Sequence, residues 1–175
     1  MEKPQRPPSA RGIHQRFNGT MHVSARVDYG MRALAELAAL STVDPQARIT
    51  TESLCTAHAI PPKFCENILR ALRTAGILDS KRGADGGFRL ARPADKISVA
   101  DAIRALDGPL VDVRGEAPED LEYAGQAAHV GEVWVATRAA VRSVLEQVTL
   151  ADIASGFFPG RVRHLLDEPG AWRRR

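Results

Sequence analysis

The chain has 175 residues, of which 44% are hydrophobic and 5% aromatic, and its formal net charge at neutral pH is +3. This length accommodates one compact domain with an extension and excludes a pair of large domains. Abundant Ala, Leu, Val and Arg favour helix over sheet, so the composition predicts a mainly α protein.

The charge is distributed unevenly along the chain. Residues 61–92 contain seven Lys or Arg and three Asp or Glu, whereas residues 107–122 contain six acidic residues and a single basic one. The first region can bind a polyanion and the second repels one. Cys55 and Cys65 lack the spacing of a disulfide framework, and the sequence shows neither a secretory leader nor a long apolar run, so a reduced, cytoplasmic protein is expected.

The N-terminal residues differ in character from the rest. Residues 1–20 combine Pro, Gly and Arg with little apolar periodicity, which predicts a flexible basic arm and leaves Met21 as an alternative start. Ser24 is a predicted N-cap, and apolar residues then recur at helical spacing from Val27 to Leu40. We therefore expect a first helix that ends near Ser41.

Two helices flank the sequence HAIPP. Thr50 can cap a short helix that runs to about Ala57, and Pro62 occupies the favoured first position of a helix over 62–75. This helix has an apolar face and an opposite polar face. The apolar face contains Phe64, Cys65, Ile68, Leu69, Leu72 and Ala75, and the polar face contains Lys63, Asn67, Arg70 and Thr74.

A glycine-rich hairpin over 77–90 comes next, with SKRGADGGFRL at its turn. The glycines permit the positive φ angles of a tight reversal, while Phe88 and Leu90 can anchor one face in the core. Its basic side chains can then reach phosphates or a minor groove. A short helix, a turn, a polar-faced helix and a basic hairpin follow one another in a winged helix-turn-helix, which we assign to residues 21–108.

Beyond the wing, Ser98 and Asp101 form a capping-box pattern for a helix that Gly108 ends. Residues 109–125 are expected to form an irregular acidic loop. A long helix is predicted for residues 126–148, and Thr149 with Asp152 caps a short helix before Gly156. Residues 157–175 are predicted to be a variable tail.

The long helix has an apolar seam with a 3.5-residue period, which is typical of coiled-coil dimerisation. The seam consists of Val130, Trp134, Thr137, Val141, Val144 and Val148. It is short for a coiled coil, so a helix packed against its own domain is the alternative.

From Met21 to about Gly156 the chain resembles the Rrf2-type bacterial transcription regulators. The resemblance rests on MHVSARVDYGMRALAELA, IPPKFCENILRALRTAGILDSKRGADGGFRLARP, ISVADAIRALDGPL and VTLADIASG. It implies a homodimer whose winged helix-turn-helix domains bind a palindromic operator, with the long helix of each protomer crossing the other. It also implies a DNA-contacting Arg at Arg82, and backbone contacts by Arg26 and Tyr29, although Tyr29 could instead pack under the wing.

Other candidate DNA contacts follow from side-chain chemistry. Asn suits adenine, Arg suits guanine and Glu can accept from cytosine. The candidates on the helix are Lys63, Glu66, Asn67 and Arg70, and those in the wing are Lys81 and Arg82. Arg89 and Arg92 are expected only to cover the hairpin. The alternative for the helix residues is a solvated polar face.

The chain departs from the family where its iron-sensing members bind an iron-sulfur cluster through three cysteines. Residues 108–128 contain no cysteine, and His129 with acidic neighbours is a poor substitute because such clusters favour thiolate ligands. We therefore expect no metal or cofactor. The remaining candidates for a signal are a small molecule or a partner protein that acts on the acidic segment.

The sequence therefore predicts a dimeric DNA-binding transcriptional regulator, with repression as the family's tendency. One alternative is a winged-helix protein-interaction module without specific DNA binding, and another is a thiol-based redox regulator that uses Cys55 and Cys65. An enzyme is not expected, because no orienting acid or oxyanion motif accompanies His58 and Cys65. The residues outside the winged helix-turn-helix domain are also too few for a cofactor-binding fold.

Overall fold

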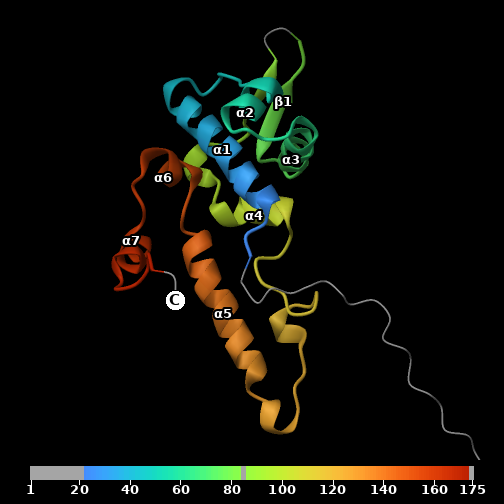
Figure 1. Ribbon diagram of the computed structural model, residues 1–175, viewed down its shortest axis with the longest axis vertical. Helices are drawn as coiled ribbons and strands as arrows, with labels where there is room; N and C mark the ends of the chain where they lie inside the picture. Colours follow the sequence, from blue (N-terminus) through green and yellow to red (C-terminus); the bar gives the residue numbers. More distant parts are fainter. Residues whose placement is uncertain (1–21, 84–85, 174–175) are drawn as a thin grey trace, which may run out of the picture.

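The structure is a computed structural model that describes residues 22–83 and 86–173 (Figure 1). The predicted basic arm and Met21 lie outside the described residues, as does Asp85 in the hairpin turn. The predicted winged helix-turn-helix domain, called the reading half below, contains α1 (Ala25–Val43), α2 (Thr51–Ala57), α3 (Pro62–Thr74), β1 (Leu78–Lys81), β2 (Gly87–Leu90) and α4 (Val99–Leu106). The rest contains α5 (Val130–Leu145), α6 (Leu150–Ser155) and α7 (Gly160–Asp167). The mainly helical fold with a small hairpin is confirmed.

Local capping explains where the first helices begin. The hydroxyl of Ser24 accepts a hydrogen bond from the Val27 amide at 3.1 Å, and the hydroxyl of Thr50 accepts one from the Ser53 amide at 3.1 Å. Each bond satisfies an amide that has no partner within its own helix. Both predicted N-caps are confirmed.

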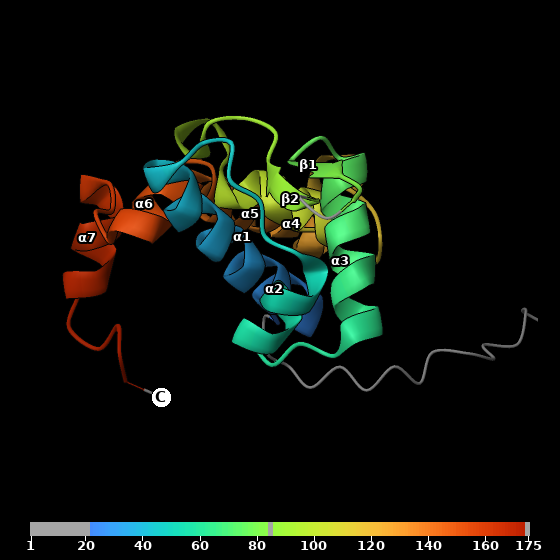
Figure 2. The same cartoon turned by 90° about the horizontal axis from the view of Figure 1, so that it is seen from above.

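The core lies around α1, which packs against α3, α4, β2 and α6. Leu34 of α1 and Leu69 of α3 are fully buried there. At Gly30, an added Cβ would come within 2.4 Å of Leu106 Cδ1, so a larger residue would require the Leu106 side chain to shift. Figure 2 shows α3 on one side of α1 and α7 on the other.

The hairpin is held to the domain by a further backbone pairing. β1 and β2 are antiparallel, with Leu78 opposite Leu90 and Lys81 opposite Gly87. Ile49, just before α2, exchanges two backbone hydrogen bonds with Phe88, of 2.8 and 3.0 Å. An added Cβ on Gly87, whose φ is 135°, would meet the Ile49 carbonyl oxygen at 2.6 Å. Glycine is therefore needed where the wing meets the domain.

The starts of α4 and α6 are joined. Ser98 forms a capping box with Asp101 and Thr149 forms one with Asp152, as predicted. Ser98 and Thr149 also face each other in an isolated antiparallel bridge. The chain between α4 and α6 therefore extends away from the domain and returns to it next to the start of α4.

This excursion consists of the acidic segment and α5. The segment contains two short 3₁₀ turns, Pro118–Asp120 and Gly125–Ala127, and is otherwise irregular. Figure 1 shows α5 extending from the domain on the side opposite the wing. Within the described parts of the chain, no helix combines the length and apolar character needed to cross a membrane.

Two expectations about the C-terminal third need correction. The long helix ends at Leu145, so Val148 lies outside it. The predicted tail contains α7, because Val162, Leu165 and Leu166 recur at helical spacing after Pro159. Val162 is the buried residue of this helix.

Candidate nucleic-acid interface

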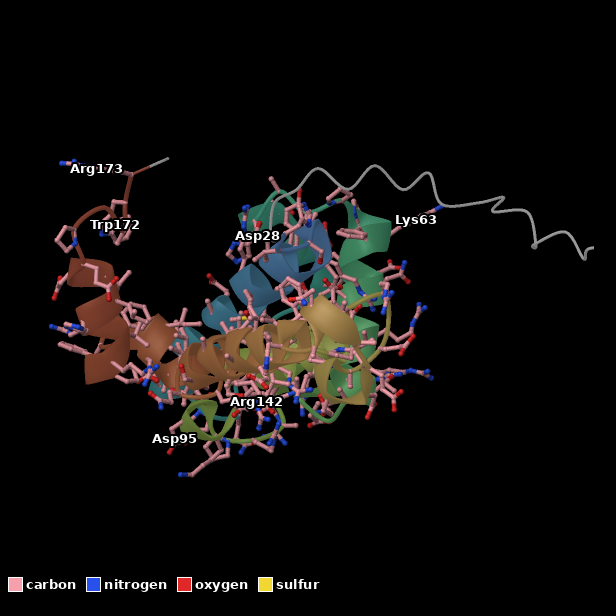
Figure 3. All side chains as sticks on the ribbon, turned by 90° about the horizontal axis from the view of Figure 1, so that it is seen from below. Asp28, Lys63, Asp95, Arg142, Trp172 and Arg173 are labelled. Carbon is pink, nitrogen blue, oxygen red and sulfur yellow. The ribbon has the colours of Figure 1, made fainter. Side chains whose placement is uncertain are left out.

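The polar face of α3 is open to solvent. Cys65, Ile68, Leu69 and Leu72 turn into the core, which leaves the opposite side of the helix free. In Figure 3, Lys63 projects outward from α3, away from the body of the domain. The predicted contacts Lys63, Glu66, Asn67 and Arg70 are all exposed, and so are Arg73 and Thr74.

The start of α1 lies beside this face. Arg26 lines an open groove of about 790 Å³ together with Asn67, Arg70 and Thr74 of α3. Arg104 of α4 lines the same groove. The groove lining contains three guanidinium groups and no carboxylate, so it suits phosphate.

Tyr29 has a more internal position than Arg26. Its ring meets the ring of Phe64 edge to face, with centroids 5.8 Å apart, and the Arg32 guanidinium lies 5.3 Å from the Tyr29 centroid. The ring therefore packs against α3, and the expected alternative of a ring under the wing is not what the contacts show. Its proposed contact with the DNA backbone remains a prediction for the hydroxyl.

In the wing, Lys81 ends β1 and Arg82 follows it, and both are exposed. Their side chains are the basic groups of the described hairpin that lie nearest to its turn. They therefore occupy the part of the wing that can reach a phosphate or a minor groove.

Arg48, Asp79 and Arg89 form a cluster that fixes the base of the wing. The sequence analysis named only Arg89 as a residue that covers the hairpin. Asp79 Oδ2 accepts hydrogen bonds from Arg48 Nη2 at 2.9 Å and from Arg89 Nε at 3.1 Å. Arg48 Nη1 also donates to the Gly87 carbonyl oxygen at 3.2 Å. The hydrogen bonds from Arg48 and Arg89 hold the pKa of Asp79 below its usual value. Arg89 therefore stabilises the hairpin, as expected, and Arg48 stabilises it from the chain before α2.

Helix α3 and the wing form one continuous surface. Arg73 Nη1 donates to the hydroxyl of Ser80 in β1 at 3.4 Å. A shallow pocket of about 280 Å³ lies between the two elements and is lined by Thr51, Glu66, Arg70, Arg73 and Phe88. Thr51 and Arg73 are additions to the sequence-predicted set. The continuation of the basic periodicity of α3 from Arg70 to Arg73 could have identified Arg73.

The acidic segment of the same chain contacts part of the predicted apolar seam of α5. Trp134 Nε1 donates to the hydroxyl of Tyr123 in the acidic segment at 3.1 Å. Val130, Thr137, Val141 and Val144 are half-buried. Val133, which adjoins them on the helix surface, is 57% exposed and was not predicted.

Val148 does not belong to this surface. It is 6% exposed, and its carbonyl oxygen accepts a hydrogen bond from the Val99 amide at 2.9 Å. The residue therefore packs within its own protomer. The 3.5-residue spacing continued past the end of the helix, which is why the sequence suggested a larger seam.

The two cysteines lie together in the core between α2 and α3, where both are buried. Burial raises the pKa of the Cys65 thiol to about 12, and a hydrogen bond with Cys55 adds to the effect. Since the thiolate is the reactive form, this environment disfavours the redox-sensing alternative. These two buried thiols are also fewer than the four protein ligands that an iron-sulfur cluster normally requires.

Other potential ligands are dispersed. Across residues 22–83 and 86–173, no three His, Cys, Asp or Glu side chains are grouped so that they could hold a metal ion. His129 Nδ1 lies 3.0 Å from Glu132 Oε1, and both side chains are exposed.

Comparisons with known proteins agree with this arrangement. The protein-family model Rrf2, described as "Iron-dependent Transcriptional regulator", matches residues 23–156. The Mycobacterium tuberculosis protein Rv1287, named as an HTH-type transcriptional regulator, is 44% identical over 148 residues, or 85% of this chain and 90% of that protein. The HTH-type transcriptional regulator CymR of Bacillus subtilis is 35% identical over 135 residues, or 77% of this chain and 91% of CymR.

Solved structures show the same similarity. The structure of CymR, the global cysteine regulator of B. subtilis, matches with a TM-score of 0.65 and 32% identity, over 78% of this chain and 98% of that chain. The structure of T. potens IscR matches with a TM-score of 0.62 and 26% identity, over 83% of this chain and 98% of that one.

Proposed function

The chain belongs to the Rrf2 family of DNA-binding transcriptional regulators, and we propose that it is a repressor that binds a palindromic operator as a homodimer. The observation that carries the proposal is the continuous surface of α3 and the wing. Arg73 of α3 contacts Ser80 of the wing, and exposed basic side chains extend from the groove beside Arg26 to Lys81 and Arg82.

Different residues of this surface have different proposed roles. Glu66 and Asn67 read base edges, because a carboxylate can accept from cytosine and an amide can pair with adenine. Lys63, Arg70, Lys81 and Arg82 contact phosphates or a minor groove and fix the register of the protein on the duplex. Arg26 and Tyr29 contact the backbone from the start of α1.

The dimer forms through α5. The helix extends away from the reading domain and none of its residues is fully buried in the protomer. Val133 and Trp134 are among the exposed large hydrophobic residues of the described chain. A second copy of α5 would cover this apolar surface. It would also hold the winged helix-turn-helix domains of the two protomers at the fixed spacing of two half-sites.

A signal is proposed to act between the reader and the dimer helix. The acidic segment and α5 line a cavity of about 320 Å³ that contains Arg138, Arg142 and Glu119. Arg138 forms an ion pair with Glu119 across this cavity. A small molecule or a partner protein that rearranges these charges would change the position of α5.

The test is selection of DNA by the purified protein from a random-sequence pool, followed by sequencing. We expect an enriched palindrome, and we expect its affinity to fall steeply with salt because phosphate contacts release counterions. Reporter expression from a promoter that contains the enriched site should rise when the gene for the protein is deleted. The absence of any enriched sequence would contradict the proposal, and reduced reporter expression would show an activator.

A further inference from the structure

Arg104 occupies a position that connects the two functional parts of the molecule. Its side chain, at the C-terminal end of α4, lines the phosphate-suited groove that contains Arg26 and Arg70. It also lines the cavity beneath the acidic segment, together with Arg138 and Arg142. No DNA-binding role was predicted for this residue from the sequence.

The arginine is held on the α5 side by a carboxylate. Arg104 Nη2 donates to Glu146 Oε1 just beyond the end of α5, across 42 residues of sequence. Arg142 Nε donates to the same oxygen at 2.9 Å. These hydrogen bonds, the one from Arg104 first, hold the pKa of Glu146 below its usual value, so the carboxylate stays charged at neutral pH.

The contact between Arg104 and Glu146 can be exchanged without leaving a charge unpaired. Both side chains are partly exposed, at 43% and 35%, so water can replace a lost hydrogen bond. Arg142, one turn before Glu146 in the chain, remains as a partner for the carboxylate. A phosphate in the groove would supply a new partner for Arg104.

We propose that Arg104 is a DNA-phosphate contact that Glu146 restrains, so that the end of the dimer helix sets how many cations the reading surface presents. The inference rests on the proposed DNA-binding function and adds a mechanism of regulation to it. In one arrangement Arg104 pairs with Glu146, and in the other it pairs with the DNA backbone. A signal that moves α5 would change the balance between the two arrangements.

The proposal predicts effects of opposite sign for the two partners. Glu146→Gln removes the competing carboxylate, so binding to the selected duplex should tighten by about two- to fivefold for each half-site, the range of one exposed ion pair. The slope of log affinity against log salt should become steeper by up to about 0.9 for each protomer, or about 1.8 for the dimer, because one phosphate contact is added at each half-site. Arg104→Gln should weaken binding and make the slope shallower by a similar amount.

The double variant distinguishes this mechanism from a general charge effect. If Glu146→Gln acts by releasing Arg104, its gain disappears in the Arg104→Gln background. If it acts only by removing a negative charge near DNA, the same gain persists there. Glu132→Gln is the matched control, since it removes another exposed carboxylate from α5, at the end of the helix farther from the reader.

The measurements are fluorescence anisotropy titrations at several salt concentrations, on the duplex that the wild-type protein selects and on a random duplex of equal length. Arg104→Met, which keeps the apolar stem, is a second variant, and circular dichroism verifies folding. Unchanged or weaker binding by Glu146→Gln, or a gain that survives in the double variant, would overturn the inference alone. Failure of the wild-type protein to bind any duplex would instead overturn the proposed function as well.

Discussion

At the scale of single residues, the arginines in and beside the wing have two different environments. Arg48 and Arg89 are paired with Asp79, whereas Arg82 is exposed next to the hairpin turn. The first group holds the wing in place, and the second is free to contact DNA. Of the basic residues Lys81, Arg82 and Arg89 in the hairpin, we therefore expect only Lys81 and Arg82 to contact DNA.

Arg82→Ala should weaken operator binding and lower the salt slope by about 0.9 for each protomer, or about 1.8 for the dimer, since one counterion-releasing contact is lost at each half-site. Lys96→Ala is the matched control, because Lys96 pairs with its neighbour Asp95, outside the wing and α3. Titrations over a range of salt concentrations provide the measurement. An unchanged slope for Arg82→Ala would remove the wing tip from the interface.

Asp79→Asn gives a test in which electrostatics and positioning predict opposite results. Removing a negative charge from a DNA-binding surface should by itself tighten binding. We expect severalfold weaker binding instead, because the carboxylate orients Arg48 and Arg89 and through them the wing. Affinity for the selected duplex is the measurement, and tighter binding would show that the cluster does not position the wing.

The same carboxylate predicts a dependence of stability on pH. Its folded-state pKa lies below the unfolded value because Arg48 and Arg89 donate to the charged form. The contribution to the free energy of unfolding is fully present above the unfolded-state pKa of about 4, and it is lost as the pH falls through the folded-state pKa. Thermal unfolding midpoints of wild type and Asp79→Asn should differ at pH 7 and converge in acid. A gap independent of pH would assign the difference to packing.

At the scale of elements, α5 is the part whose role depends most on a second copy. Val133→Glu combined with Thr137→Glu places two charges on its apolar side, and we expect monomers in sedimentation velocity. Operator affinity should fall by about a hundredfold or more, because the second reader no longer binds intramolecularly. Ala139→Glu adds a charge to the other side of the exposed helix. A dimer that survives the double change but not the control would place the interface there.

The elements differ in how far the sequence could predict them. Helix caps such as Ser98 with Asp101 were predicted because both hydrogen bonds join residues three apart. The faces of α3 followed from the helical period for the same reason. The pairing of Arg48 with Asp79 spans 31 residues and depends on how β1 is placed against the chain before α2, which local periodicity does not encode. The residues predicted on the polar face of α3 are therefore exposed as expected, while the contacts that hold the wing were found only in the structure.

At the scale of the whole molecule, the thiols lie away from the acidic segment, where we propose that a signal acts. Cys55 and Cys65 are buried in the reader, and the acidic segment contains no cysteine. We expect protein purified without oxygen and supplied with iron and sulfide to contain no iron-sulfur cluster and to bind its operator unchanged. Visible absorbance, iron analysis and DNA titration are the measurements. Stoichiometric iron with cluster absorbance would contradict this prediction and indicate unusual ligands such as His129.

The packing of α6 on α1 also affects how the protein is made. Leu150 of α6 is fully buried in the same core as Leu34 of α1, although the two residues lie far apart in the sequence. Contacts of such separation form late, since a long loop must close first. All the residues proposed to contact DNA leave the ribosome before the helix that completes the core beneath them. A premature stop codon between the end of α4 and the start of α6 should therefore abolish operator binding, even though the truncated product contains every residue proposed to contact DNA.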